Sequence, residues 1–300
     1  MDPLVPLVSP LEAAAYTEVG RGSAVMGVHA AGQLARAAGA LAEVGPRLSV
    51  LIVTGFFIKG AAVPAPETDG PLGALELFAA VRAMGGEAWL ATDEFCAPVL
   101  TAALPIGGAE GRLLVAPADG FEDWLEDAEA WMAEHQITHL VFIERAGPGR
   151  DGVIRDMRGT DISGWTLPMQ RLASKTSAQS IGVGDGGNEI GMGAMPTEVI
   201  ERVVKHGADI RCVVSTDNLI VGGTSNWGAH ALVGALHSLG TPGLEPWLEE
   251  EWHREALTAL ADAGACDGVD RVVKPTVDGL TGDLYFGVVR AISAIATRAK

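Results

Sequence analysis

The chain has 300 residues, of which 48% are hydrophobic and 20% are charged. This composition excludes a disordered or fibrous protein and predicts a single globular domain over 1–300, with a helical segment at about 1–45. The 38 acidic residues outnumber the 21 lysines and arginines, so the net charge is −17. Such a charge disfavours nucleic acid and anionic membranes, and we expect a small anionic substrate that is captured by local cations, N–H groups or a metal.

Short β-branched segments alternate with longer amphipathic segments along the chain. We predict strands at 49–55, 87–92, 112–117, 138–144, 180–185 and 209–215. We predict helices at about 23–43, 71–84, 94–103, 121–135, 165–176, 196–206, 226–239, 246–263 and 283–299. This alternation predicts an α/β fold with a mostly parallel sheet and helices on both faces, a Rossmann-like three-layer sandwich. Ligands of such sheets bind beyond the C-terminal ends of the strands, so the loops there are the candidate site.

The N-terminus lacks the cationic start and the uninterrupted apolar stretch of a signal peptide. The most apolar window, 48–63, contains glycine and lysine and is shorter than the ~20 residues of a membrane-spanning helix. The three cysteines form no Cys-x-x-Cys pair, which predicts reduced thiols. We therefore expect a cytoplasmic protein without membrane partners.

The loop at 55–73 is longer than the ~2–6 residues of most strand-to-helix connections. Glu67, Thr68 and Asp69 lie where a substrate or a metal can reach them, and Lys59 supplies a nearby cation. Asp69 is equally well interpreted as the N-cap of the following helix, because a proline comes two residues later.

A charged segment at 147–164 concentrates the arginines of the chain. A guanidinium group binds a carboxylate through two parallel hydrogen bonds, so Arg155 is a candidate substrate-binding residue. The alternative is that the segment is a solvated loop with no binding role.

The segment GVGDGGNEIGMG (182–193) follows a predicted strand directly and gives the strongest local signal. Its glycines match G-x-G-x-x-G, a pattern typical of dinucleotide sites, but Asp185 would place a carboxylate among the phosphate-binding N–H groups. Mg²⁺ or Mn²⁺ held by Asp185 and Glu189 resolves that conflict, since both ions prefer oxygen ligands. The alternative is a glycine-rich turn capped by Asp185. Substrate contacts in this segment are predicted for Gly186, Gly187 and Asn188.

Two polar groups of residues bracket Leu219, Ile220 and Val221. The second group begins a helix, and its N–H groups are able to hold a carboxylate, although Ser225 or Asn226 is also a plausible N-cap. The predicted substrate contacts are Thr216, Asn218, Thr224, Ser225 and Asn226, and Asp217 is a candidate catalytic residue.

Together these segments resemble the D-glutamate cyclase-like C-terminal domain family, from about residue 10 to the end. The resemblance rests on TGF after the first strand and on PETDGPLGA, GVGDGGNEIGMG, STDNLIVGGTSNWGAHAL and VDGL (277–280). In larger relatives the domain follows a hydro-lyase-like domain, whereas here it stands alone. The resemblance implies a partner of that type on a separate chain, and a homo-oligomer is also possible.

The resemblance implies a metal-dependent hydro-lyase that closes D-glutamate to 5-oxo-D-proline with loss of water. In that reaction Mg²⁺ or Mn²⁺ on Asp185 and Glu189, with Asp69 and Asp217 as further ligands, polarises the carboxylate. Glu67 or Asp217 then serves as the base, and the catalytic candidates are Glu67, Asp69 and Asp217.

Two other functions compete with this interpretation. The G-D-G-x-N-E motif is similar to the last motif of haloacid-dehalogenase-like phosphohydrolases, which bind Mg²⁺, but no aspartate follows the first strand as their nucleophile would. The other alternative is a non-catalytic ligand-binding accessory domain of a hydro-lyase, because no unmistakable nucleophile is present.

Overall fold

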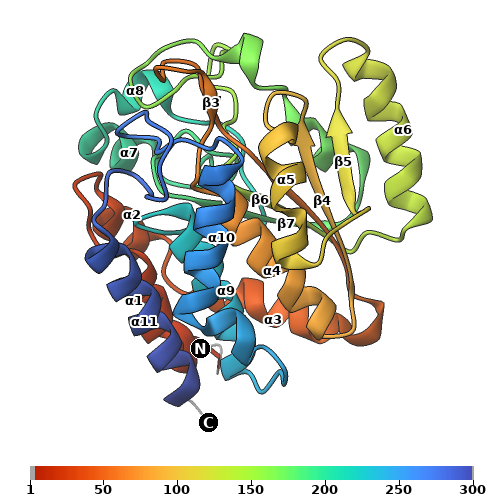
Figure 1. Ribbon diagram of the computed structural model, residues 1–300, viewed down its shortest axis with the longest axis vertical. Helices are drawn as coiled ribbons and strands as arrows, with labels where there is room; N and C mark the ends of the chain where they lie inside the picture. The colour runs from red at the N-terminus through yellow and green to blue at the C-terminus, as the bar shows by residue number, and fades with distance from the viewer. Residues whose placement is uncertain (1–3, 299–300) are drawn as a thin grey trace.

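The computed structural model describes residues 4–298, which fold around a six-stranded parallel sheet (Figure 1). The strands are β1 (Ser49–Thr54), β4 (Glu87–Asp93), β5 (Leu113–Ala116), β6 (His139–Ile143), β7 (Gln179–Gly184) and β8 (Asn218–Val221). Their spatial order is β5-β4-β1-β6-β7-β8, and β2 (Phe57–Ile58) and β3 (Ala65–Pro66) form a separate hairpin. From β1 the sheet extends through β4 and β5 to one edge, and from β6 it extends through β7 and β8 to the other edge. The order reverses between these two strands, where open α/β sheets bind ligands.

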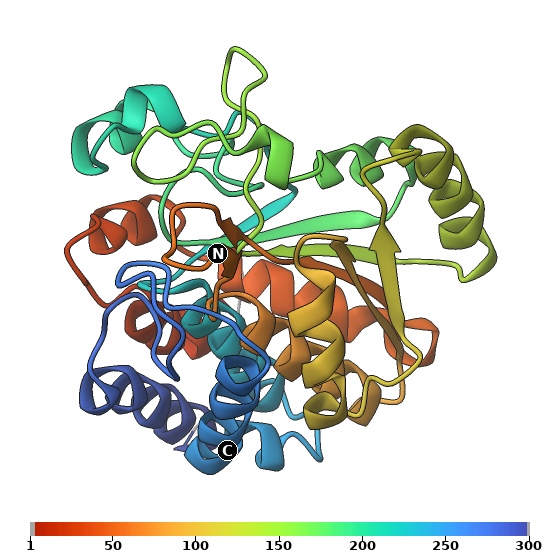
Figure 2. The ribbon, with the colours of Figure 1, turned by 45° about the horizontal axis from the view of Figure 1, so that its top comes forward.

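Helices cover both faces of the sheet, which confirms the three-layer α/β prediction (Figure 2). Side chains alternate along β1, so Val50 and Ile52 pack into one core and Leu51 and Val53 into the other. The first core contains α1 (Val5–Ala15), α3 (Gln33–Val44), α4 (Pro71–Ala83), α5 (Ala97–Gly107), α9 (Ser225–Ser238), α10 (Glu250–Asp262) and α11 (Gly282–Arg298). The opposite face carries α2 (Ser23–His29), α6 (Phe121–Glu134), η3 (Met169–Lys175), α7 (Thr197–Val203) and α8 (Gly207–Ile210).

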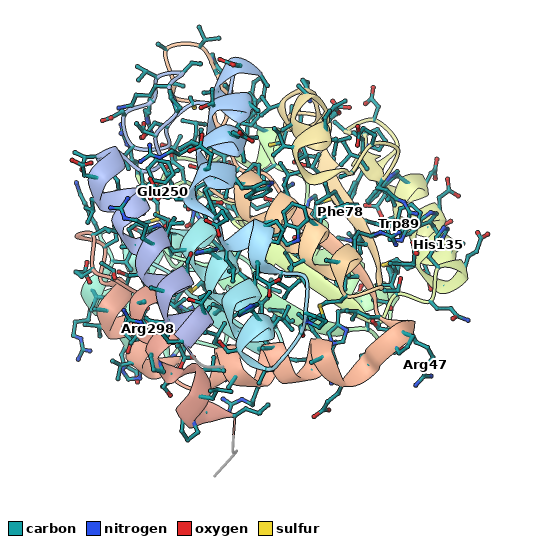
Figure 3. The ribbon with its side chains drawn as sticks, turned by 60° about the horizontal axis from the view of Figure 1, so that its bottom comes forward. Arg47, Phe78, Trp89, His135, Glu250 and Arg298 are labelled. Carbon is teal, nitrogen blue, oxygen red and sulfur yellow. The ribbon has the colours of Figure 1, made fainter. Side chains whose placement is uncertain are left out.

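Helix α9 is the central element of the thicker layer, since every one of its residues is buried. It packs closely against α4, because a Cβ atom added at Gly73 would lie only 2.6 Å from Cβ of Ala229. Phe78 of α4 packs into the core on this side of the sheet, whereas Trp89 packs against the opposite core, with its ring 4.8 Å from that of His135; all three are labelled in Figure 3. Two small residues thus set the distance between α4 and α9, and with it the relative position of their N-termini.

Five of the six predicted strands are confirmed, and the strand predicted at 209–215 is wrong. That segment hydrogen-bonds to loops instead of the sheet: Cys212 N–H donates to Gly187 O, and Gly191 N–H donates to Val214 O. The sixth strand is β8, built from the apolar residues that follow. Within the described residues no helix is long and apolar enough to cross a membrane.

Two predicted helices also differ from the structure. The helix predicted at 23–43 is two helices, because Gly32 has a φ of 82° and its N–H and that of Leu34 donate to the Glu12 carboxylate, which ends one helix and starts the next. The helix predicted at 165–176 consists of short 3₁₀ segments, η2 (Ser163–Trp165) and η3.

Replacing Gly73 by alanine tests the close packing of α4 against α9. Although alanine favours a helix, we expect G73A to lower the free energy of unfolding by about 1–3 kcal/mol, because the two Cβ atoms cannot both fit. In the control G287A in α11, the added carbon meets only the Arg290 guanidinium at 3.8 Å, so we expect a gain of up to about 1 kcal/mol. Urea denaturation measures both values. Equal stabilisation by both substitutions would show that α4 and α9 do not need the glycine.

Candidate functional site

Carboxylates from several loops meet beyond the C-terminal ends of β1, β6 and β7. Glu144 follows β6 and Asp185 follows β7, while Asp69 precedes α4 and Asp278 lies in the loop before α11. One oxygen from each of Asp69, Asp185 and Asp278 lies within 4.8 Å of the other two. The acids therefore gather at the position where the strand order reverses.

A cavity of about 620 Å³ opens over these acids. Its buried lining includes the carboxylates of Glu67, Glu144 and Asp185, each no more than 5% exposed. Its outer lining, the rim, carries the cations Arg158, Lys205 and Arg271, together with His206 and with Asp156, which lies 3.5 Å from the Arg271 guanidinium. The cavity thus has an acidic floor and a basic rim, in a chain that is strongly acidic overall.

Backbone strain is concentrated around this cavity. Among the described residues, five residues other than glycine have a positive φ, and four of them line the cavity. These four are Glu144 (44°), His206 (62°), Arg271 (60°) and Asp278 (55°). Such conformations persist only where surrounding contacts enforce them, and they cluster at binding and catalytic sites.

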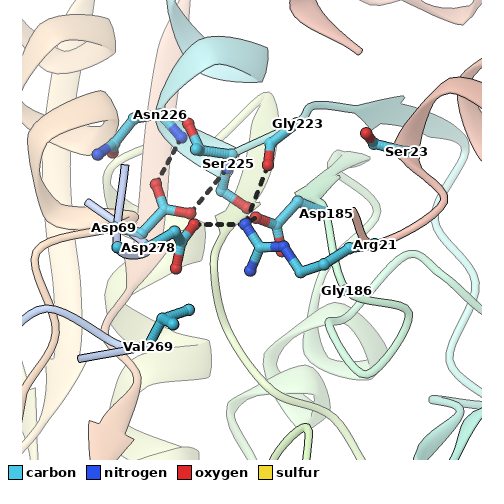
Figure 4. Close-up of polar contacts among 12 residues, drawn as sticks. Arg21, Ser23, Asp69, Asp185, Gly186, Gly223, Ser225, Asn226, Val269 and Asp278 are labelled. Carbon is cyan, nitrogen blue, oxygen red and sulfur yellow. Dashed lines mark hydrogen bonds and ion pairs between the residues drawn. The ribbon is translucent and has the colours of Figure 1, made fainter. Parts of the chain in front are cut away.

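Asp69 and Asn226 join the N-termini of α4 and α9 behind the cavity (Figure 4). The Asp69 carboxylate accepts the N–H groups of Ser225 (2.9 Å) and Asn226 (2.8 Å) in the first turn of α9. In return, Asn226 Oδ1 accepts the N–H groups of Gly70 (2.9 Å) and Gly73 (3.0 Å) at the start of α4. Each helix start is therefore capped by a residue that belongs to the other.

Arg21 brings a positive charge to the three aspartates (Figure 4). Its Nη2 atom lies 2.6 Å from Asp278 Oδ2 and 2.8 Å from Asp185 Oδ2, and it donates to Gly223 O at 3.0 Å. The contact with Asp185 is not aligned as a hydrogen bond, so Asp185 Oδ2 has no donor among the described residues. Three acids thus share a single guanidinium.

The shared burial of these acids raises their pKa values. Burial, then the charges of Asp278 and Asp69, raise the pKa of Glu67 well above its usual range. Burial and the neighbouring Glu189 do the same to the pKa of Glu144. For Asp69, burial and Asp278 outweigh the N–H donors of α9, and the pKa rises to about 7. Burial and mutual repulsion oppose full ionisation of the cluster, and an added proton or metal ion would relieve that repulsion.

The glycine-rich loop after β7 is closed by its own glutamate. The Glu189 carboxylate accepts the N–H groups of Asp185 (3.2 Å), Gly186 (2.6 Å) and Gly187 (2.7 Å). The glycines permit this fold, because a Cβ atom at Gly186 would lie 3.0 Å from Glu189 Oε1. One oxygen from each of Glu144, Asp185 and Glu189 lies within 4.8 Å of the other two, so these acids form a second group suited to a metal, and the Glu189 carboxylate also holds the loop. Gly186 and Gly187 therefore have no N–H left for a substrate.

Several residues predicted for the site lie away from the cavity. Asp217, predicted as a base and a metal ligand, is exposed. Its carboxylate accepts hydrogen bonds from the backbone N–H and the hydroxyl group of Ser180 at the opposite end of the sheet. Thr216 and Asn218 lie beside it at the start of β8. The error in the sixth strand explains the three wrong positions. A strand at 209–215 would put these residues at its C-terminal end, whereas β8 begins at Asn218 and puts them at its N-terminal end. Lys59 and Arg155 also lie outside the lining; Lys59 is exposed and Arg155 pairs with Asp151.

Other predicted contacts are buried residues that hold the loops together. Thr68 Oγ1 donates to Thr276 O (2.6 Å), and Asn188 Nδ2 donates to Arg155 O (2.8 Å). Thr224 is the N-cap of α9 and accepts the Trp227 N–H. Ser225 lies closer to the acids, since its Oγ donates to Glu144 Oε2 at 2.5 Å.

Sequence reasoning missed the other half of the site. Asp278 lies in the VDGL segment, and its loop is organised by the buried Asp267, which accepts the N–H groups of Val269, Asp270 and Gly279. Glu144 ends a correctly predicted strand, so its position alone could have identified it. Of the rim cations, Arg158 lies in the charged segment singled out from the sequence, whereas Arg21, Lys205 and Arg271 carry no sequence signal that separates them from surface cations.

Comparisons with known proteins identify the family of this chain. A family model described as D-glutamate cyclase-like, C-terminal, matches residues 11–293. A human protein named D-glutamate cyclase, mitochondrial, is 35% identical over 77% of this chain and 43% of its own length. The chain thus spans less than half the length of that relative. The match over nearly its entire length places this chain in the D-glutamate cyclase-like C-terminal family.

Proposed function

We propose that this chain closes D-glutamate to 5-oxo-D-proline with loss of water. The observation that carries the proposal is the charge arrangement of the cavity, in which buried carboxylates lie beneath the exposed Arg158 and Lys205 and the half-buried Arg271. Glutamate carries one ammonium group and two carboxylates, so it matches both parts of the lining. Membership of the family and the name of the human relative support the same reaction.

The reaction moves two protons from nitrogen to oxygen. The ammonium nitrogen loses two of its three protons and forms a bond to the γ-carbon. One oxygen of the γ-carboxylate departs with these two protons as water. The enzyme must therefore hold the two ends of the substrate together and carry protons between them.

The residues of the cavity can be assigned to these tasks. Glu67 and Glu144 face the ammonium group, and Glu67 carries the protons, because its buried Oε1 has no partner among the described residues. Arg158, Lys205 and Arg271 of the rim bind the carboxylates. Asp69 is a positioning residue, since it ties the start of α4 to α9 and does not line the cavity.

The aspartates fit a divalent metal. Asp69, Asp185 and Asp278 offer carboxylate oxygens within 4.8 Å of one another, and Asp185 Oδ2 is buried without a hydrogen-bond donor. Arg21 Nη2 contacts Asp185 and Asp278 at this position, so the guanidinium would have to move aside for an ion to bind. Mg²⁺ and Mn²⁺ prefer such oxygen ligands. When bound, a divalent ion would supply Lewis acidity that polarises the γ-carboxylate. Asp69 and Asp185 are retained here from the sequence prediction and Asp278 is added, while Glu189 stays a predicted ligand through the second group, Glu144, Asp185 and Glu189.

A companion hydro-lyase-like chain and a homo-oligomer also remain proposals. The length of the human relative supports the first, since more than half of it lies outside the matched region. Binding of D-glutamate without turnover by the isolated chain would favour the accessory-domain alternative.

Replacing Glu67 by glutamine tests the proton-carrying role. We expect the wild-type chain to convert D-glutamate to 5-oxoproline, and E67Q to lower kcat by about a hundredfold or more, because the amide cannot accept a proton. Mass spectrometry of the product measures the rate. The matched control is E87Q, which changes an exposed glutamate paired with Arg82 and Arg112 and should keep full activity. Full activity of E67Q would remove Glu67 from the mechanism.

Replacing Asp185 by asparagine tests the metal site. We expect D185N to weaken Mn²⁺ binding at least about tenfold, because it removes a charged ligand. Isothermal titration calorimetry of the metal-free protein measures this without reference to turnover. The control is D217N, which removes the carboxylate at the opposite end of the sheet and should leave Mn²⁺ affinity unchanged. Equal affinities for wild type and D185N would rule out the metal site.

A further inference from the structure

The cavity continues into a second hollow on the far side of Arg158 and His206. These two residues line both spaces. The second hollow has a volume of about 700 Å³ and lies between the charged segment at 147–164 and α8. We call it the basic groove; its lining is Arg150, Asp151, Arg155, Arg158, Gly159, His206, Ala208 and Asp209.

The basic groove carries unpaired positive charge. Arg155 is neutralised by two hydrogen bonds to Asp151, at 2.8 and 2.6 Å. Arg150 and Arg158, by contrast, have no carboxylate within 4.0 Å among the described residues. The Asp209 carboxylate also lines the hollow and forms no ion pair among the described residues, so two unpaired arginines face one unpaired acid. In a chain with a net charge of −17, this local surplus of positive charge favours an anionic ligand there.

The size of the two spaces exceeds what free glutamate needs. A cavity of about 620 Å³ falls within the range of about 300–1,000 Å³ that encloses a drug-sized ligand. Glutamate is much smaller, and it would leave most of this cavity and all of the basic groove empty. A substrate that extends past Arg158 would fill both.

Building on the proposed function, we propose that the preferred substrate is a γ-D-glutamyl amide whose amine portion carries an anionic group that lies in the basic groove. The glutamyl unit occupies the cavity as glutamate would. The γ-carbon is where the ring closes, so a group attached there is the one that departs. In a γ-amide the glutamyl unit keeps only its α-carboxylate, which Lys205 and Arg271 bind. Arg158 then joins Arg150 in holding the carboxylate of the departing group.

The chemistry balances without another reactant. The substrate nitrogen forms a bond to the γ-carbon, and the bond between that carbon and the departing amine breaks. A proton lost by the substrate nitrogen passes through Glu67 to the departing nitrogen, so the products are 5-oxo-D-proline and a free amine. Water is neither consumed nor formed, and nothing is oxidised or reduced.

The test compares γ-D-glutamyl-D-glutamate, its α-linked isomer and free D-glutamate, with 5-oxoproline and released glutamate measured by mass spectrometry. We expect kcat/KM to be at least about tenfold higher for the γ-linked compound than for free D-glutamate. R150A should raise KM for the γ-linked compound about fivefold at low salt and less at high salt, because the arginine is exposed. It should leave D-glutamate turnover unchanged, since Arg150 lines only the groove.

The control for R150A is R112A, which removes another arginine at a site paired with Glu87 and should alter none of these values. Turnover of D-glutamate without turnover of the γ-linked compound would overturn this inference and leave the proposed function intact. Preference for the α-linked isomer would also overturn it. Failure of all three compounds would overturn the proposed function as well.

Discussion

Asp69 and Asn226 hold the N-termini of α4 and α9 against each other, and the positions of the other site residues follow from this contact. The carboxylate lies at the positive end of one helix and the amide at the positive end of the other, so each satisfies N–H groups that the helix cannot pair internally. Small residues at Gly73 and Ala229 let the helices approach closely enough for this exchange. The loop that carries Glu67 is thereby anchored at one end.

Several hydrogen bonds and ion pairs allow so many acids to be buried in one place. Asp69 is stabilised by two N–H donors, Asp278 and Asp185 by Arg21, and Glu144 by the Ser225 hydroxyl. These partners reduce the repulsion without removing it, which is why burial still raises the pKa values of Glu67, Glu144 and Asp185. The remaining repulsion favours any ligand that brings positive charge, whether a metal ion or a substrate ammonium group.

Local patterns identified much of this fold and about half of this site. Buried parallel strands are continuous apolar runs, so five were found, together with the loops that follow β1 and β7. The sixth failed because 209–215 and 218–221 are both apolar, and only tertiary hydrogen bonds decide which one joins the sheet. Because of that error, Asp217 was predicted at the C-terminal end of the sheet, whereas it lies at the N-terminal end beside Ser180. Arg21 and Asp278 were missed because each reaches the site from a distant part of the chain.

The Glu189 carboxylate distinguishes the glycine-rich loop after β7 from the phosphate-binding loops that it resembles in sequence. The order of the strands and the G-x-G-x-x-G spacing both occur in dinucleotide-binding proteins, where free N–H groups hold a phosphate. Here an internal carboxylate takes the place of that phosphate and accepts three N–H groups. The Glu189 carboxylate therefore takes the role that a phosphate group has in a dinucleotide site. The residue two positions after Gly187, the last glycine of the motif, distinguishes the two kinds of loop. Loss of this glutamate would leave three buried N–H groups without their acceptor.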